Sequence, residues 1–241
     1  MNREAHPPQT PHHPLLNKAP RDLVPFLEVL SPSEYDLVCN SPDSNARIFA
    51  THTPLVSLPN SVSASLSKCK IVYMCRDIKD NFVSLFHFAN KTTLRTSPIS
   101  LEEAFDLYSK GISETGPVWD QILGYWKQSV EEPQKVLFMK YEEMKNEPLF
   151  QLRRLAKFLG KPFTHEEENS CLVDQIISLC SFETMTKLDV NKMVNLVDGT
   201  SNSSFFRKGV VGDWKNCLTA EMATKLDEIT EEKFRGSGFS L

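Results

Sequence analysis

Apolar and polar residues follow one another along the chain in blocks that predict short strands, each leading into a helix. The five apolar residues from Ile71 to Cys75 have the length of a buried strand. Directly after them, apolar residues recur at helical spacing from Ile78 to Phe86 and form one stripe. The pattern therefore predicts a strand over 71–75 and a helix that begins at Ile78.

A second apolar run, residues 136–140, predicts another strand, and Arg47–Ala50 is a shorter candidate. Strands that lead into helices indicate an α/β fold, with a parallel sheet flanked by helices. Start and stop signals, such as Ser, Thr or Pro before the stripe and Gly after it, predict further helices. These helices cover 101–111, 118–130, 148–159, 168–180 (opened by Thr164) and 219–235.

Large aromatic side chains in the predicted helix over 118–130 recur at helical spacing. We expect Trp119 and Trp126 to belong to the core, which is commoner for such residues than a ligand cage.

The first part of the chain has a different composition. Eight of the fifteen prolines lie in residues 2–46, and proline blocks long helices and central strands, so we expect an irregular segment. A short helix is predicted after Ser31-Pro32. The histidines around Pro7–Pro14 fit a metal tract or a solvated loop, and the solvated loop is favoured. We expect one domain over residues 1–241 that includes this segment.

Composition and charge narrow the class of protein. The chain has 241 residues and a net charge of −4, which argues against nucleic acid as the main partner. No apolar run approaches the length of about 20 residues that a membrane span needs, and the start has no apolar signal-peptide region. The six cysteines form no C-x-x-C pair and no zinc-like spacing with histidine. We therefore expect a cytoplasmic chain with reduced thiols and no metal.

Arg76 and Ser84 are the first candidates for chemistry. Arg76 follows the predicted strand directly, where open α/β sheets bind ligands, and Ser84 lies in the helix that follows. An arginine fork, a hydroxyl and helix N–H groups together suit a phosphate. The alternative is that Arg76 forms a surface ion pair with Asp77 or Asp80.

His52 is the second candidate, because it comes just after a strand candidate and its turn is fixed by Pro54. A histidine in this position is well placed to transfer a proton. The alternative is a turn histidine that faces water or caps a backbone group.

The stretch 204–214 is the third candidate. It puts two aromatic residues, the adjacent cations Arg207 and Lys208, and two glycines into one loop. A lid over a flat ring and a phosphate would use these residue types. The alternative is a basic loop that precedes a helix.

Several motifs, in order and in register, resemble those of the soluble PAPS-dependent sulfotransferases. The residues within these motifs are most similar to those of the plant cytosolic branch. They spread over most of the chain, which makes the resemblance specific. The motifs are Thr51-His52-Thr53-Pro54, then Tyr73 to Phe88, Lys140 to Met144, Ser181 to Met185 and Phe206 to Asn216.

This resemblance implies a P-loop-NTPase-like sulfotransferase fold and transfer of a sulfonate group from 3′-phosphoadenylyl sulfate (PAPS) to a hydroxyl of a small metabolite. It implies a general base, His52, and a pair that holds the 3′-phosphate of the donor, Arg76 and Ser84. It also implies a residue beside the adenosine, Tyr141, and a loop that closes over the phosphate, Arg207-Lys208-Gly209. The acceptor and the oligomeric state stay open.

One departure from the family is evident in the sequence. Family members begin with a strand, a glycine-containing phosphate loop with a lysine, and a helix, whereas the first glycine here is Gly111. We therefore expect the first strand–loop–helix unit to be missing, the edges of the neighbouring strands to be unpaired, and turnover to be very low. The alternative function is a catalytically inactive remnant that binds nucleotide or acceptor weakly.

Overall fold

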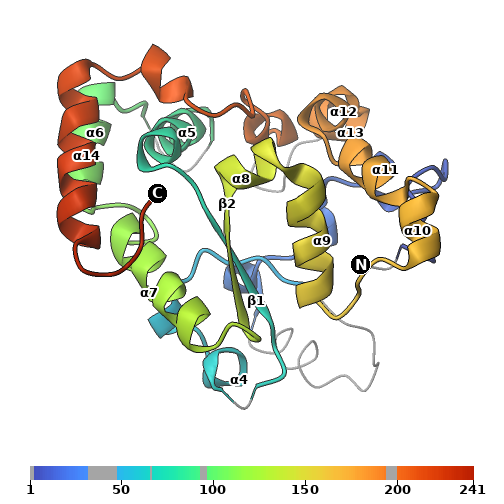
Figure 1. Cartoon of the computed structure of the whole chain (residues 1–241). Coiled ribbons are helices and arrows are strands. Elements are labelled where there is room, and N and C mark those ends of the chain that lie inside the picture. Colours follow the sequence, from blue (N-terminus) through green and yellow to red (C-terminus); the bar gives the residue numbers. More distant parts are fainter. Residues whose placement is uncertain (1–2, 32–47, 66, 93–96, 194–199) are drawn as a thin grey trace.

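Two parallel strands lie at the centre of the molecule. The computed structural model describes residues 3–31, 48–65, 67–92, 97–193 and 200–241. Strand β1 (Ile71–Cys75) pairs in parallel with β2 (Val136–Lys140), with Ile71 opposite Val136 and Cys75 opposite Lys140. Helices lie on both sides of this pair (Figure 1). The predicted α/β architecture with a parallel sheet is confirmed.

The two strands differ in burial. All of β2 except its last residue is buried, whereas β1 alternates, with Val72 39% and Met74 46% exposed. In the described part of the chain, β1 pairs with β2 alone. The face of β1 that bears Val72 and Met74 is therefore partly exposed to solvent.

The third strand candidate, Arg47–Ala50, is wrong for the residues that the structure describes. Ala50 forms only an isolated parallel bridge with Phe26, and Arg47 lies outside the described residues. The flanking Pro25 has no N–H to donate, so the bridge does not extend into a ladder.

Both strands lead directly into helices at the same end of the sheet. Helix α5 (Ile78–Lys91) follows β1, and the Asp77 side chain caps it by accepting from the amides of Lys79 and Asp80, each at 3.0 Å. Helix α8 (Tyr141–Asn146) follows β2. The carboxyl ends of β1 and β2 therefore meet where α5 and α8 begin (Figure 1).

The remaining helices form two groups around the strands (Figure 1). One group holds α6 (Leu101–Ser109), α7 (Val118–Glu131) and α14 (Ala220–Phe234). The other holds α9 (Pro148–Phe158), α10 (His165–Asn169), α11 (Leu172–Leu179), α12 (Phe182–Lys187) and α13 (Asp189–Met193). Short 3-10 turns are η2 (Leu55–Ser57), η3 (Asn202–Phe205) and η4 (Asp213–Asn216), and α4 (Asn60–Ser63) is a single helical turn.

The core lies between β1, α5, α7 and α14. Trp119 is 1% exposed, and its indole N–H donates to the Thr230 hydroxyl at 2.9 Å. Trp126 packs on Phe138 of β2 with ring centroids 5.5 Å apart. The expectation that these aromatics belong to the core is confirmed.

The helix predicted from the Thr164 cap to Cys180 is two helices. Between α10 and α11, Cys171 has a φ of 57°, a left-handed conformation that interrupts the helical hydrogen bonds. The Thr164 side chain caps α10 through the amide of Glu167, as predicted. The predicted helix start at the Thr164 cap is therefore confirmed. The prediction of one helix as far as Cys180 is wrong, because the helix breaks at Cys171.

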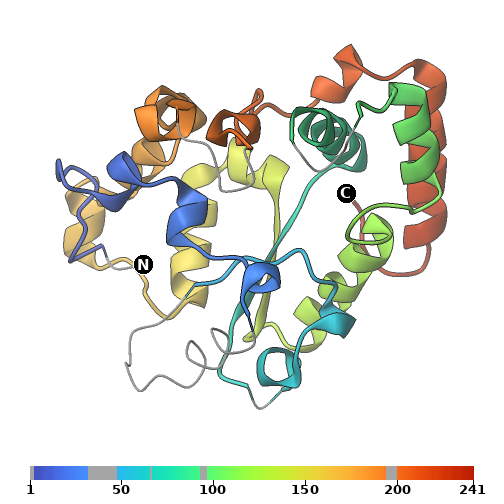
Figure 2. The same cartoon turned by 180° about the vertical axis from the view of Figure 1, so that it is seen from behind.

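The proline-rich segment is mostly irregular in its described part. It holds three single turns, α1 (Pro14–Asn17), α2 (Pro20–Leu23) and η1 (Leu27–Val29), and proline begins the first two. Arg3 donates to the carbonyls of Lys161 and Pro162, at 3.0 and 2.8 Å, just after α9. Figure 2 shows the segment running beside α9. The helix predicted after Ser31-Pro32 lies outside the described residues.

Candidate functional site

Arg76 lies at the carboxyl end of β1 and is held from two sides. Its guanidinium lies 4.8 Å above the ring of Tyr141, the first residue of α8, and its Nη2 donates to the Val210 carbonyl at 3.1 Å. Its Nε is buried and has no hydrogen-bond partner among the described residues. Arg76 is therefore held from two sides with its buried Nε–H unpaired in the described part of the chain, as a residue that binds an anion would be.

Arg76 also lies near a carboxylate, so the alternative of an ion pair is partly correct. Its Nη2 is 3.9 Å from Asp80 Oδ2, but Asp80 is only 1% exposed, which excludes a surface pair. The two oxygens of Asp80 accept from the amides of Gly212, at 2.6 Å, and Trp214, at 3.0 Å. Asp80 thus joins α5 to the 204–214 loop.

Ser84 follows Asp80 by one turn of α5 and is half-buried. Residues four apart on a helix share a face, so Ser84 lies on the side of α5 that bears Asp80. His87 lies one turn further along α5. Burial lowers the pKa of its imidazole, and the nearby charge of Arg207 lowers it further. This face of α5 is therefore the one that the 204–214 loop covers.

The two cations of the loop share one carboxylate. Asp213 is 3% exposed and accepts from Arg207, from Lys208 at 2.7 Å and from the Asn216 amide at 3.0 Å. Burial alone would raise the pKa of Asp213, but the hydrogen bonds from Lys208, Asn216 and Arg207 hold it well below its usual range. The loop is therefore charged, internally paired and closed on itself.

Gly209 is fixed by close contact. Its φ is +63°, and a Cβ at this position would lie 2.4 Å from the ring of Phe182. Phe182 begins α12, where the Ser181 side chain caps the helix by accepting from the Thr184 amide at 3.1 Å. The motif 181–185 therefore supports the loop at its glycine.

His52 lies in a separate, exposed loop. Its ring stacks on Phe26 with centroids 5.0 Å apart, and its amide donates to Glu28 Oε1. The same oxygen accepts from the hydroxyls of Thr51, at 2.7 Å, and Thr53, at 3.3 Å. Burial would raise the pKa of Glu28, but these hydrogen bonds and the nearby His52 lower it.

The structure thus brings Arg76, Tyr141 and the 204–214 loop together. Ser84 lies on the face of α5 that this loop covers. Among the described contacts, His52 touches none of them directly. Arg21 and three phenylalanine rings form a series of contacts between the His52 loop and α5. Arg21 lies over Phe26, at 5.9 Å, and over Phe205, at 4.9 Å, and Phe205 contacts Phe88 of α5 at 5.0 Å.

Sequence reasoning missed two of the carboxylates that hold these loops, Glu28 and Asp213, and named the third, Asp80, only as an alternative surface ion-pair partner of Arg76. Asp80 had a usable signal, because it is four residues from both Arg76 and Ser84. Asp213 lies five and six residues after the loop cations Lys208 and Arg207 in the sequence. Glu28 has no such signal, since its partners lie more than twenty residues away.

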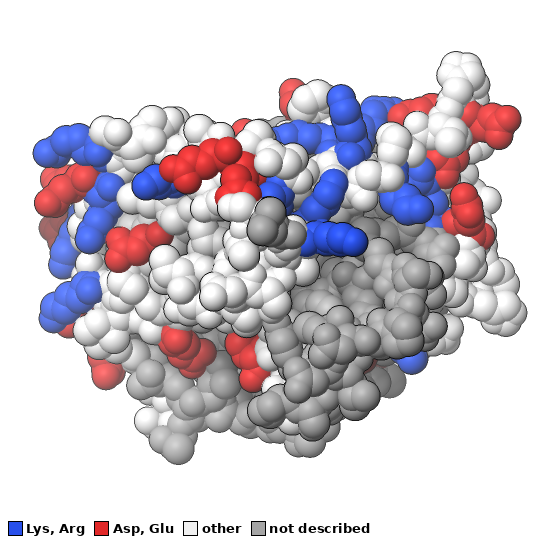
Figure 3. All heavy atoms as spheres, turned by 90° about the horizontal axis from the view of Figure 1, so that it is seen from below, with Lys and Arg blue, Asp and Glu red and all other residues white. Residues whose placement is uncertain are grey.

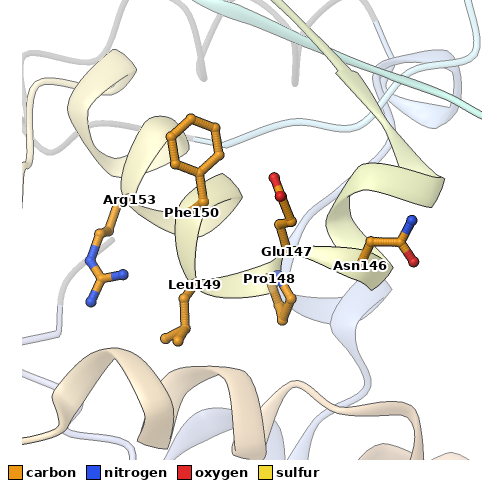
Figure 4. Close-up of a pocket in the computed structure, with 6 residues that line it drawn as sticks. All are labelled: Asn146, Glu147, Pro148, Leu149, Phe150 and Arg153. Carbon is orange, nitrogen blue, oxygen red and sulfur yellow. The ribbon is translucent and has the colours of Figure 1, made fainter.

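A surface hollow of about 490 Å³ lies elsewhere, at the junction of α8 and α9. Figure 4 shows its lining, in which Phe150 and Glu147 point to one side and Leu149 to the other. None of the predicted site residues lines it, so it is not the predicted donor site.

The described residues include no group of three or more His, Cys, Asp or Glu side chains placed to hold a metal ion. They also include no helix long and apolar enough to span a membrane. On the face in Figure 3, Lys and Arg lie among Asp and Glu around an uncharged area.

Comparison with known proteins decides the family. The model described as "Sulfotransferase domain" matches residues 1–238. The chain belongs to the sulfotransferase domain family. Cytosolic sulfotransferase 8 of Arabidopsis thaliana is 47% identical over 233 residues, which are 95% of this chain and 69% of that protein.

Solved sulfotransferase structures share the fold. A mouse sulfotransferase complexed with PAP superposes with a TM-score of 0.75 at 27% identity, over 93% of this chain and 79% of that one. An Arabidopsis thaliana putative steroid sulphotransferase gives 0.68 at 37% identity, over 100% and 70%. The predicted sulfotransferase resemblance and fold are confirmed, and the roles of the individual residues stay predictions.

Proposed function

We propose that this sulfotransferase moves a sulfonate group from PAPS to a hydroxyl of a small metabolite in the cytoplasm. One observation carries the proposal. Arg76, Tyr141 and the 204–214 loop meet at the shared carboxyl end of two parallel strands, where such sheets bind ligands. The PAP bound to the mouse relative supports a nucleotide of this class, and the relatives named cytosolic support the location.

On the donor side, the 3′-phosphate is the proposed ligand of Arg76 and Ser84. This role is supported because a guanidinium fork suits a phosphate and the Nε of Arg76 has no hydrogen-bond partner among the described residues. The loop residues Arg207, Lys208 and Gly209 would close over the same phosphate, and Tyr141 would lie beside the adenosine.

On the acceptor side, His52 is the proposed general base. It would take the proton from the acceptor hydroxyl as that oxygen forms a bond to sulfur. The bond between sulfur and the 5′-phosphate oxygen breaks, and adenosine 3′,5′-bisphosphate leaves with the electron pair. The exposure of His52 and its stacking on Phe26 leave its ring accessible to an acceptor.

The second candidate is a chain that binds nucleotide or acceptor weakly without turnover. It is favoured by the absence of glycine before Gly111, since a phosphate loop needs close backbone approach to the leaving phosphate. Each lost donor to a developing anion costs about 10²–10³ in rate. For this sequence we therefore expect weak binding of the bisphosphate and slow transfer.

Titration of the purified chain with adenosine 3′,5′-bisphosphate, beside a transfer assay with labelled PAPS and a panel of hydroxylated metabolites, tests both candidates. Labelled product above the level of a His52→Ala variant supports the enzyme. Binding without product supports the second candidate, and the absence of both contradicts the donor site itself.

A further inference from the structure

The donor side contains a buried acid in a place where an anion is expected to bind. Asp80 is 1% exposed, and its Oδ2 is 3.9 Å from the Arg76 guanidinium. By charge alone, this carboxylate repels a phosphate and neutralises the arginine that should attract it. The position of a negatively charged side chain in a proposed anion site therefore needs an explanation from its contacts.

The hydrogen bonds of Asp80 supply that explanation. Its two oxygens accept from the amides of Gly212 and Trp214, 132 and 134 residues further along the chain. Arg76, four residues before Asp80, donates to the Val210 carbonyl of the same loop at 3.1 Å. Three hydrogen bonds, at Val210, Gly212 and Trp214, thus join the end of the 204–214 loop to the junction of β1 and α5.

The attachments also set where the loop cations lie. Asp213 lies in the sequence between Gly212 and Trp214, whose amides Asp80 accepts from, and it accepts in turn from Arg207 and Lys208. A loop that detaches from Asp80 would take Asp213 and both cations away from Arg76. The close approach of Gly209 to the Phe182 ring constrains the middle of the loop and not its end at Gly212 and Trp214.

We infer that Asp80 is a positioning residue for 3′-phosphate binding: it keeps the 204–214 loop docked beside Arg76, so that removing its charge weakens the binding of the bisphosphate instead of strengthening it. The inference rests on the proposed function for the identity of the ligand. A purely electrostatic role gives the opposite sign, which makes the two distinguishable.

The test compares Asp80→Asn with Asp106→Asn, which removes an exposed carboxylate on α6 that pairs with Lys110. NMR titrations use adenosine 3′,5′-bisphosphate and, as a ligand control, adenosine 5′-monophosphate, which lacks the 3′-phosphate. We expect Asp80→Asn to weaken bisphosphate binding about tenfold, equivalent to ~1.4 kcal/mol. The monophosphate and the Asp106→Asn variant should show little change. Unchanged or tighter bisphosphate binding in Asp80→Asn overturns the inference.

Amide hydrogen exchange gives a second readout that needs no ligand. In Asp80→Asn, exchange should rise across residues 207–216 and stay unchanged in α7. If the unaltered chain binds no bisphosphate, the proposed function fails, and the positioning role is then decided by this exchange pattern alone. If Asp80→Asn does not fold, the amides of Gly212 and Trp214 in the unaltered chain decide. Protection supports the inference, and fast exchange of both overturns it.

Discussion

Two loops hold the predicted chemistry, and a carboxylate fastens each of them in a different environment. Glu28 is exposed and collects the amide of His52 and the hydroxyls of Thr51 and Thr53 on one oxygen. Asp80 is buried and collects two backbone amides on two oxygens. Water competes for the first set of hydrogen bonds and is excluded from the second, so the loss of Asp80 should cost much more.

The difference fits the roles proposed for the two loops. Under that proposal, a donor loop fastened by a buried charge would keep one geometry, which suits a single nucleotide. The His52 loop is held by contacts worth little individually, so we expect it to adapt to acceptors of different shape. From this contrast we expect the strength of each fastening to follow the burial of its carboxylate more than the number of its hydrogen bonds.

The largest expected effect is on the donor side. We predict that Arg76→Ala weakens binding of adenosine 3′,5′-bisphosphate about 100-fold, because it removes a charged donor and the contact to Val210 together. NMR titration measures the change, and Arg153→Ala, which removes a partly exposed arginine paired with Glu168, is the matched control. Equal affinity in Arg76→Ala and the control would remove Arg76 from the proposed site.

The next effect concerns the loop backbone. Gly209→Ala places a methyl group 2.4 Å from the Phe182 ring and holds a positive φ, so we expect it to lower the free energy of unfolding by about 2–4 kcal/mol. Gly212→Ala has the same sign of φ but open space around the new methyl, so about 1–2 kcal/mol is expected. Chemical denaturation of both variants compares them. Equal losses would mean that contact with Phe182 does not fix the loop.

The smallest effect concerns the exposed fastening. We predict that Glu28→Gln lowers the free energy of unfolding by less than about 1 kcal/mol at pH 7. The pKa of Glu28 is lower in the folded chain than its ordinary value, so its contribution is present at neutral pH. That contribution is lost as the pH falls through the folded pKa. Denaturation curves at pH 7 and pH 3 should therefore show the difference between variant and parent shrinking, and a difference that grows on acidification would contradict this role.

Much of the fold could be predicted from the sequence because the signals were local. The run 71–75, the stripe from Ile78 and the cap at Thr164 each depend on neighbouring residues, and each has its predicted structure. The break at Cys171 and the single bridge at Ala50 could not, since a left-handed residue other than glycine and a proline-limited bridge leave no periodic pattern.

The candidate site divides in the same way. Arg76 and the loop 204–214 were found from residue type and position, and the structure brings them together. Their fastening by Asp80 and Asp213 depends on contacts across the fold and on burial, neither of which a charge pattern reveals. An acid near an arginine was therefore interpreted as a surface pair, although Asp80 is almost completely buried.

The internal pairing of the loop cations has a consequence for how a nucleotide arrives. Arg76, Arg207 and Lys208 together carry three positive charges, and Asp80 and Asp213 carry two negative charges, so the cluster presents a net charge of +1. Long-range steering of an anion depends on that net charge and weakens with salt. The association rate of a bisphosphate should therefore depend only weakly on ionic strength, and selectivity should come from short contacts made after encounter.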